Sequence, residues 1–141
     1  PFLSAVIAMN LCGRSADARR ERRWHLVIPA LAGAVGFVVS SLAADNTVIA
    51  IIFLSIAACG VLTCAPLFWS LPTAFLSGTG AAAGIAVINS VGNLAGFLSP
   101  YLIGILKDYT HNNQSGMFML AGTLVVGAIA VLRTSARMVN R

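Results

Sequence analysis

A stretch of 61 residues without a charged side chain or a histidine, from Asn46 to Leu106, constrains this chain more than any other feature. A water-soluble domain of 141 residues needs charged side chains over its whole surface. A helix crosses the hydrocarbon core of a bilayer with about 20 apolar residues. The stretch is therefore long enough for two membrane spans, and a composition of 58% hydrophobic and 9% charged residues agrees. We expect an all-α integral membrane protein.

Charged loops and a glycine-rich turn divide the chain into four complete spans and the end of a fifth. Ser77 to Gly80 (Ser-Gly-Thr-Gly) is the clearest turn inside the uncharged stretch. The apolar segment before Gly13 is too short to cross a bilayer, so we expect it to be the end of a span in a longer protein. The expected spans cover residues 1–12 (partial), 26–44, 47–76, 80–106 and 116–134.

The distribution of basic residues predicts how the chain lies in the membrane. Of nine Lys and Arg residues, five lie in the loop from Gly13 to Trp24, three follow Leu132, and only Lys107 lies elsewhere. Loops rich in Lys and Arg stay on the cytoplasmic side. We therefore expect this loop and the C-terminus in the cytoplasm, most simply at a bacterial inner (plasma) membrane, with the Asp45 turn outside. Such topology anchors explain the net charge of +5 better than nucleic-acid binding does.

The residues that usually carry chemistry are absent or isolated. Apart from Arg133 at the end of the last one, the complete spans contain no charged residue, which leaves no proton-relay carboxylate or counter-ion in this part of the protein. The sequence has no paired nucleophile and base, no phosphate-binding loop and no cluster of metal ligands. His25 and His111 fall at the ends of spans and are interpreted as interfacial residues. We expect no enzymatic activity, no cofactor and no metal.

Three polar or amphipathic residues stand out within the spans. Asn89 and Asn93 are four residues apart and therefore share one face of a helix. Their amides either bond to a neighbouring helix or face a water-filled cavity and a polar substrate. Trp69 lies deeper than the interfacial belt where tryptophan usually sits, and it either lines a cavity or packs in the core. The residues alone leave both pairs of alternatives open.

Three segments resemble a known family of carriers. Gly13-Arg-Ser-Ala-Asp17, followed by Arg22-Arg23, resembles the second-half copy of the loop motif Gly-x-x-x-Asp-Arg-x-Gly-Arg-Arg of the major facilitator superfamily. The segment 68–78 (Phe-Trp-Ser-Leu-Pro-Thr-Ala-Phe-Leu-Ser-Gly) and the segment 83–97 (Ala-Gly-Ile-Ala-Val-Ile-Asn-Ser-Val-Gly-Asn-Leu-Ala-Gly-Phe) resemble its anion:cation symporter branch, which includes tartrate, phthalate and sugar-acid permeases. The resemblance covers nearly the whole chain.

The resemblance implies a position in the fold and a role for several residues. The chain would be the end of helix 8 and helices 9–12 of a twelve-helix major facilitator fold, part of its C-terminal six-helix half. Trp69 and Asn89 match positions that contact the organic anion in sugar-acid members, and Asn93 follows by helical phase. The loop motif implies a gate, carried here by Gly13, Asp17, Arg22 and Arg23. Ala18 and Arg20 depart from the motif, because they replace its Arg and its second Gly.

These implications predict a secondary active transporter that carries a carboxylate-bearing anion, such as a sugar acid, tartrate or an aromatic carboxylate, by proton-coupled symport. The two six-helix halves of such a carrier would expose a midplane site to each side in turn. The expected partners are the lipid bilayer, this small anion and the missing N-terminal half of the carrier. The alternative is a membrane fragment or helix-packing module that does not transport.

Overall fold

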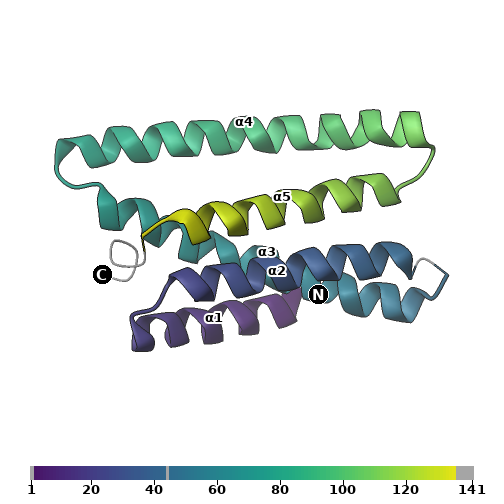
Figure 1. Cartoon of the computed structure of the whole chain (residues 1–141), viewed down its shortest axis with the longest axis horizontal. Coiled ribbons are helices and arrows are strands. Elements are labelled where there is room, and N and C mark those ends of the chain that lie inside the picture. Colours follow the sequence, from purple (N-terminus) through teal and green to yellow (C-terminus); the bar gives the residue numbers. More distant parts are fainter. Residues whose placement is uncertain (1, 44, 136–141) are drawn as a thin grey trace.

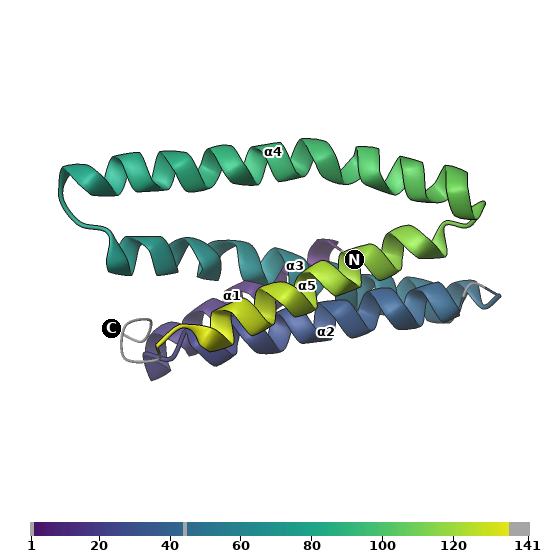
Figure 2. The same ribbon diagram turned by 45° about the horizontal axis from the view of Figure 1, so that its top comes forward.

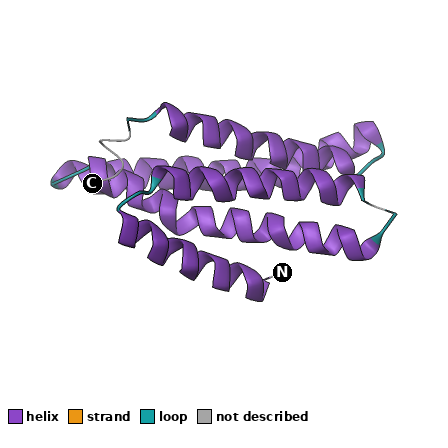
Figure 3. Cartoon of the chain, turned by 60° about the horizontal axis from the view of Figure 1, so that its bottom comes forward, coloured by secondary structure: helices purple, strands orange, loops and turns teal. Residues whose placement is uncertain are grey.

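A computed structural model describes residues 2–43 and 45–135. Within these residues the chain forms five helices and no strand (Figures 1 and 3), so the expectation of an all-α fold is confirmed. Four of the helices, α2 to α5, are long and apolar enough to cross a membrane. Pro1, Ala44 at the end of the expected second span, and the basic residues Arg137 and Arg141 lie outside the described residues. The helices are α1 (Phe2–Arg19), α2 (Arg23–Leu42), α3 (Thr47–Phe75), α4 (Thr79–Thr110) and α5 (Gln114–Arg133).

Consecutive helices run in opposite directions, so their turns alternate between the two ends of the molecule. The turns α1–α2 and α3–α4 lie at one end, together with the end of α5 (Figure 1). The turns α2–α3 and α4–α5 lie at the other end. The basic turn around Arg20 and the last residues of α5 therefore share one end, as the charge distribution requires if both face the same side of a membrane.

The centre of the bundle is the packing of α2 against α3 and α5, with α1 lying along α3. Small residues allow α2 and α3 to approach closely. A Cβ atom at Gly36 would lie 2.7 Å from the carbonyl oxygen of Phe53, and one at Gly60 would lie 2.7 Å from the Cα of Gly33. Both positions are buried. The close approach of α2 and α3 thus depends on glycines of both helices.

Helix α4 stands apart from the other four helices along most of its length (Figures 1 and 2). None of its residues is buried, and it meets the bundle through α3 and α5. The sequence spacing of Gly92 and Gly96 would allow another helix to approach closely. Within the described part of the chain nothing lies within 4 Å of a Cβ atom built at either position. That close contact is not made here, whereas Gly36 and Gly60 make one that the sequence did not indicate.

The predicted loop from Gly13 to Trp24 is wrong in its extent. Helix α1 continues to Arg19 and α2 begins at Arg23, so the turn itself contains only three residues. The amide of Arg20 donates to the carbonyl of Asp17 (3.3 Å), and the amide of Glu21 donates to the carbonyl of Ala16 (3.1 Å). These two bonds form a Schellman motif, which ends α1. Charged residues do not interrupt a helix that extends beyond the hydrocarbon core of the membrane. The charge pattern therefore overestimated the length of the loop.

Arg20 occupies the position of this motif that glycine prefers. Its φ of 49° is left-handed, and this conformation costs a residue with a Cβ about 1 kcal/mol. The loop motif of the family has Gly at the same place. We therefore expect Arg20→Gly to raise the free energy of unfolding by about 1 kcal/mol, measured as an increased melting temperature in detergent.

Arg19→Gly is the matched control, because it removes the same charge one residue earlier, where the backbone is helical. It should lower the melting temperature, since glycine weakens a helix by up to about 1 kcal/mol. If both variants shift the melting temperature in the same direction, the left-handed backbone at Arg20 is not the cause.

Candidate functional site

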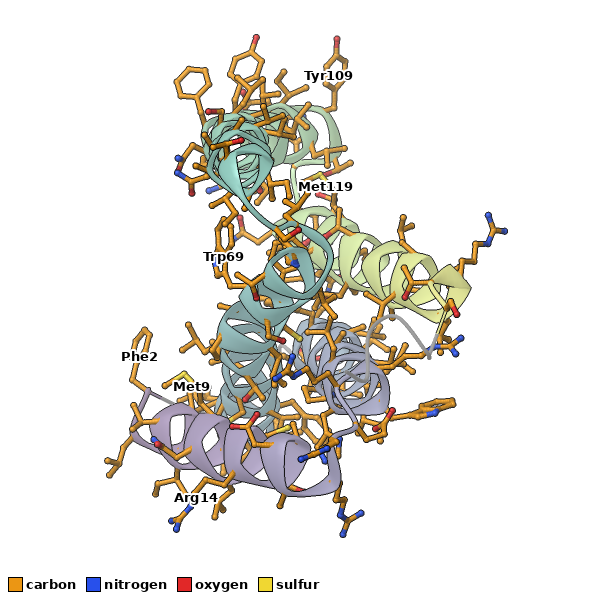
Figure 4. The ribbon with its side chains drawn as sticks, turned by 90° about the vertical axis from the view of Figure 1, so that its left-hand side faces the viewer. Phe2, Met9, Arg14, Trp69, Tyr109 and Met119 are labelled. Atoms are coloured by element: carbon orange, nitrogen blue, oxygen red, sulfur yellow. The ribbon has the colours of Figure 1, made fainter. Side chains whose placement is uncertain are left out.

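Trp69 lies near the end of α3 that leads into α4. Pro66 and Pro72 lie on either side of it, and α3 continues through both prolines. The Trp69 ring packs edge-on against Phe68, with ring centroids 5.7 Å apart and planes inclined at 71°. The residue is 37% exposed, and its side chain lies on the part of α3 that faces α4 (Figure 4). Trp69 is thus not a core residue.

A cavity of about 510 Å³ between α3 and α4 brings the three predicted substrate-binding residues together. Asn89 and Asn93 lie one turn apart on α4, some 20 residues after Trp69 in the sequence, and all three line this cavity. Within residues 2–43 and 45–135 neither asparagine amide has a hydrogen-bond partner. The other lining residues are apolar: Phe68, Val87, Ile88, Val91 and Gly92.

The lining of this cavity suits a small molecule that has both polar groups and C–H surface. Each asparagine amide offers two hydrogen-bond donors and one acceptor, and the indole N–H of Trp69 is a further donor. The aromatic and aliphatic residues supply an apolar wall. None of the residues that line the cavity is ionisable, so these groups would bind an anion by hydrogen bonds and dipoles without a formal counter-charge.

Trp69 also lines a second, apolar cavity of about 490 Å³ between α2, α3 and α5. Leu26, Cys64 and Val131 are among its other lining residues. The tryptophan therefore separates a polar-edged cavity beside α4 from an apolar one inside the bundle. A substitution of Trp69 would therefore alter the lining of both cavities.

Three residues of the loop motif lie together at the end of α1. The Arg22 guanidinium Nη2 lies 3.9 Å from the Asp17 carboxylate Oδ1, and the Asp17 side chain is 76% exposed. An exposed pair at this distance contributes little stability. Gly13, one turn before Asp17, lines a cavity of about 430 Å³ with both residues, against the Pro66 region of α3.

Arg23, the fourth residue of the loop motif, points to a different part of the molecule. It is the first residue of α2, and its Nη2 donates to the carbonyl oxygen of Leu132 near the end of α5. A basic side chain on the last carbonyls of a helix satisfies groups that have no partner in the helix. The two arginines of the motif thus have separate roles: Arg22 faces α1, and Arg23 ties α2 to α5.

Sequence reasoning did not single out Phe68, although it lines the cavity beside Trp69. The signal was the pair of adjacent aromatic residues between two prolines. It was missed because neighbouring residues usually point to different faces of a helix. Here both rings border the same cavity.

Comparison with known proteins gives several relatives. Over the whole chain, 38% of residues are identical to a protein of Pseudomonas putida named as the metabolite transport protein NicT, of which 32% is covered. A protein of Agrobacterium vitis named as a tartrate transporter is 45% identical over 94% of this chain and 30% of its own length. The inner membrane transport protein RhmT of Escherichia coli is 34% identical over 93% of this chain and 30% of its own length.

The chain spans about a third of the length of these relatives and matches their C-terminal part. No family model matches the chain, and no solved structure gives a significant match. The relatives nevertheless cover nearly all of its residues at 34–45% identity, and its helices have the length and apolar character of membrane spans. By these matches the chain is similar to the C-terminal part of transporters of the major facilitator superfamily, and its helices fit the corresponding part of that twelve-helix fold.

Proposed function

We propose that this chain is the C-terminal part of a secondary active transporter that moves an organic carboxylate anion together with a proton. The observation that carries the proposal is the shared cavity of Trp69, Asn89 and Asn93 between α3 and α4. In the complete carrier the missing N-terminal half would close this cavity from the open face of α4. The two halves would then expose it alternately to either side of the membrane.

The chemistry of the cavity supports a hydroxylated carboxylate as the substrate. An amide N–H donates to a carboxylate oxygen, and an amide oxygen accepts from a substrate hydroxyl. The two unpartnered asparagines, Asn89 and Asn93, can supply both kinds of bond, while Trp69 covers the C–H surface between them. Tartrate has this pattern of groups, and one of the relatives is named as a tartrate transporter. Because the lining is uncharged, the proton would bind to a group elsewhere in the carrier.

The basic residues support an orientation with the C-terminus in the cytoplasm. The α1–α2 turn and the end of α5 share one end of the molecule and are joined by Arg23 and Leu132. Both segments are rich in arginine, which favours the cytoplasmic side. In this orientation the loop motif of Gly13, Asp17, Arg22 and Arg23 lies at the inner surface, where it would act as the inward gate.

Uptake into liposomes tests the proposed function. We expect the complete carrier to accumulate at least one of tartrate, a sugar acid or phthalate when the outside is acidic, and a protonophore should abolish the accumulation. The dimethyl ester of the same acid is the control, because it lacks the charge and should not accumulate. If neither a proton gradient nor a sodium gradient drives uptake of any of these acids, the chain is not part of such a symporter.

A further inference from the structure

The turn between α1 and α2 contains a chain of hydrogen bonds that the loop motif does not include. The Oγ of Ser15 on α1 lies 3.0 Å from the Nε2 of His25 on α2. The Nδ1 of the same ring lies 3.2 Å from the Oε2 of Glu21, which is in the turn. The imidazole therefore bridges two helices and the turn that joins them.

Two further bonds connect the same residues. The second carboxylate oxygen of Glu21, Oε1, accepts a bond from the backbone amide of Trp24 (3.1 Å), in the first turn of α2. The thiol of Cys12 on α1 lies 3.5 Å from the backbone carbonyl of His25, to which it donates. Helix α1 is thus joined to His25 both at the ring and at the backbone, while Glu21 holds the ring and the start of α2 together.

The bridge can form in either protonation state of the histidine. The Glu21 carboxylate accepts only, so Nδ1 carries a proton in both states. In the neutral ring Nε2 accepts the Ser15 hydroxyl proton, and in the imidazolium Nε2–H donates to the Ser15 oxygen. The link between α1 and α2 is therefore a structural feature of this turn and does not depend on whether the imidazole carries one proton or two.

This bridge lies where α1 and α2 would otherwise have little contact. Helix α1 packs mainly along α3 and touches α2 only slightly. Beneath the turn, Ala16 and Leu26 pack with Leu67 and Leu71 of α3 in a small buried cluster. Arg22 and Arg23 follow Glu21 directly and have partners on α1 and α5 respectively. The direction in which these two arginine side chains point depends on the backbone conformation of the turn.

We propose that His25 is a positioning residue of the loop motif, which acts through its bond to Ser15. The bridge fixes the turn so that Arg22 faces Asp17 while Arg23 reaches the end of α5. Removing the bridge lets α1 separate from α2 at this end and uncovers Cys12. The consequence for transport rests on the proposed function, whereas the geometric part of the proposal does not.

Two substitutions of His25 distinguish the bond to Ser15 from the bond to Glu21. The amide nitrogen of glutamine can replace Nε2, and that of asparagine can replace Nδ1. His25→Gln should therefore keep the link between the helices, whereas His25→Asn keeps only the local bond to Glu21. Ser15→Ala removes the link from the other side and should behave like His25→Asn.

The reaction of Cys12 with N-ethylmaleimide measures the opening of the turn in the complete carrier. Rates are followed for each cysteine by mass spectrometry, and they include Cys59, whose thiol lies against Ser4 of α1 and which lines the same cavity as Cys12. A lost hydrogen bond corresponds to about a fivefold change in an opening equilibrium. We expect Ser15→Ala and His25→Asn to accelerate alkylation of Cys12 about fivefold, with His25→Gln, which keeps the link, near wild type.

Alkylation is measured without substrate, so it tests the bridge even if no anion is transported. Equal Cys12 rates in the wild type, Ser15→Ala and His25→Asn would overturn the proposal, as would His25→Gln behaving like His25→Asn. In uptake assays the same two disruptive variants should lower kcat and leave KM unchanged, because the bridge touches no residue of the cavity beside α4. A changed KM with normal Cys12 rates would contradict a positioning role.

Discussion

Gly36→Leu is expected to prevent α2 and α3 from packing together and to abolish most of the yield of folded protein. A Cβ atom at position 36 would lie 2.7 Å from both the amide nitrogen of Ala57 and the carbonyl oxygen of Phe53. These are backbone atoms of α3, and unlike a flexible side chain they cannot move away by changing rotamer. Overpacking of a core costs about 1–3 kcal/mol or more even where side chains can adjust. Folded yield and melting temperature in detergent measure the effect, and Gly36→Ala should give a smaller loss in the same direction.

Gly122 on α5 provides the matched control. Within the described residues nothing lies within 4 Å of a Cβ atom at this position, which is exposed on the surface of the bundle. Gly122→Ala should leave the melting temperature unchanged or raise it, because alanine favours a helix by about 1 kcal/mol over glycine. A Gly36→Leu protein that melts like wild type would show that α2 and α3 are not held together at this contact.

The helices and their number could be predicted from the sequence because each span is a long apolar segment between polar turns. The ends of α1 and α2 could not, since charge marks where a chain leaves the membrane and not where a helix stops. The end of α1 is instead set by the left-handed backbone at Arg20. The spacing of Gly92 and Gly96 allows another helix to approach closely, but within the described residues the close approach occurs at Gly36 and Gly60. Glycine spacing indicates where helices can approach, and the tertiary arrangement decides where they do.

The candidate site could be predicted only in part. Helical phase placed Asn89 and Asn93 on one face, but it could not show that this face lies opposite Trp69, because their meeting depends on how α4 returns along α3. His25 was interpreted only as an interfacial residue, and its bridge between Ser15 and Glu21 was not predicted. The spacing of four residues between Glu21 and His25 does indicate one of its two bonds, the one between these two side chains.

Asn89→Ala is expected to weaken binding of the proposed organic anion substantially. The asparagine amide has no partner in the described part of the chain, so its bonds are available to a substrate. A hydrogen bond to a charged group contributes about 1.5–3 kcal/mol, which corresponds to a dissociation constant raised about tenfold to a hundredfold. Expression and membrane insertion should not change, because the side chain is exposed in α4. Equilibrium binding to the purified complete carrier measures the effect.

The dissociation constant of the transported anion, compared between Asn89→Ala and Ser90→Ala, tests the proposed binding site most directly. Ser90 is the neighbouring residue on α4, but its hydroxyl bonds to the carbonyl of Ala86 in its own helix (2.8 Å) and it does not line the cavity. A site formed by Trp69, Asn89 and Asn93 predicts a dissociation constant raised at least about tenfold by Asn89→Ala and unchanged by Ser90→Ala. Equal dissociation constants for the wild type and both variants would show that the anion binds elsewhere in the carrier.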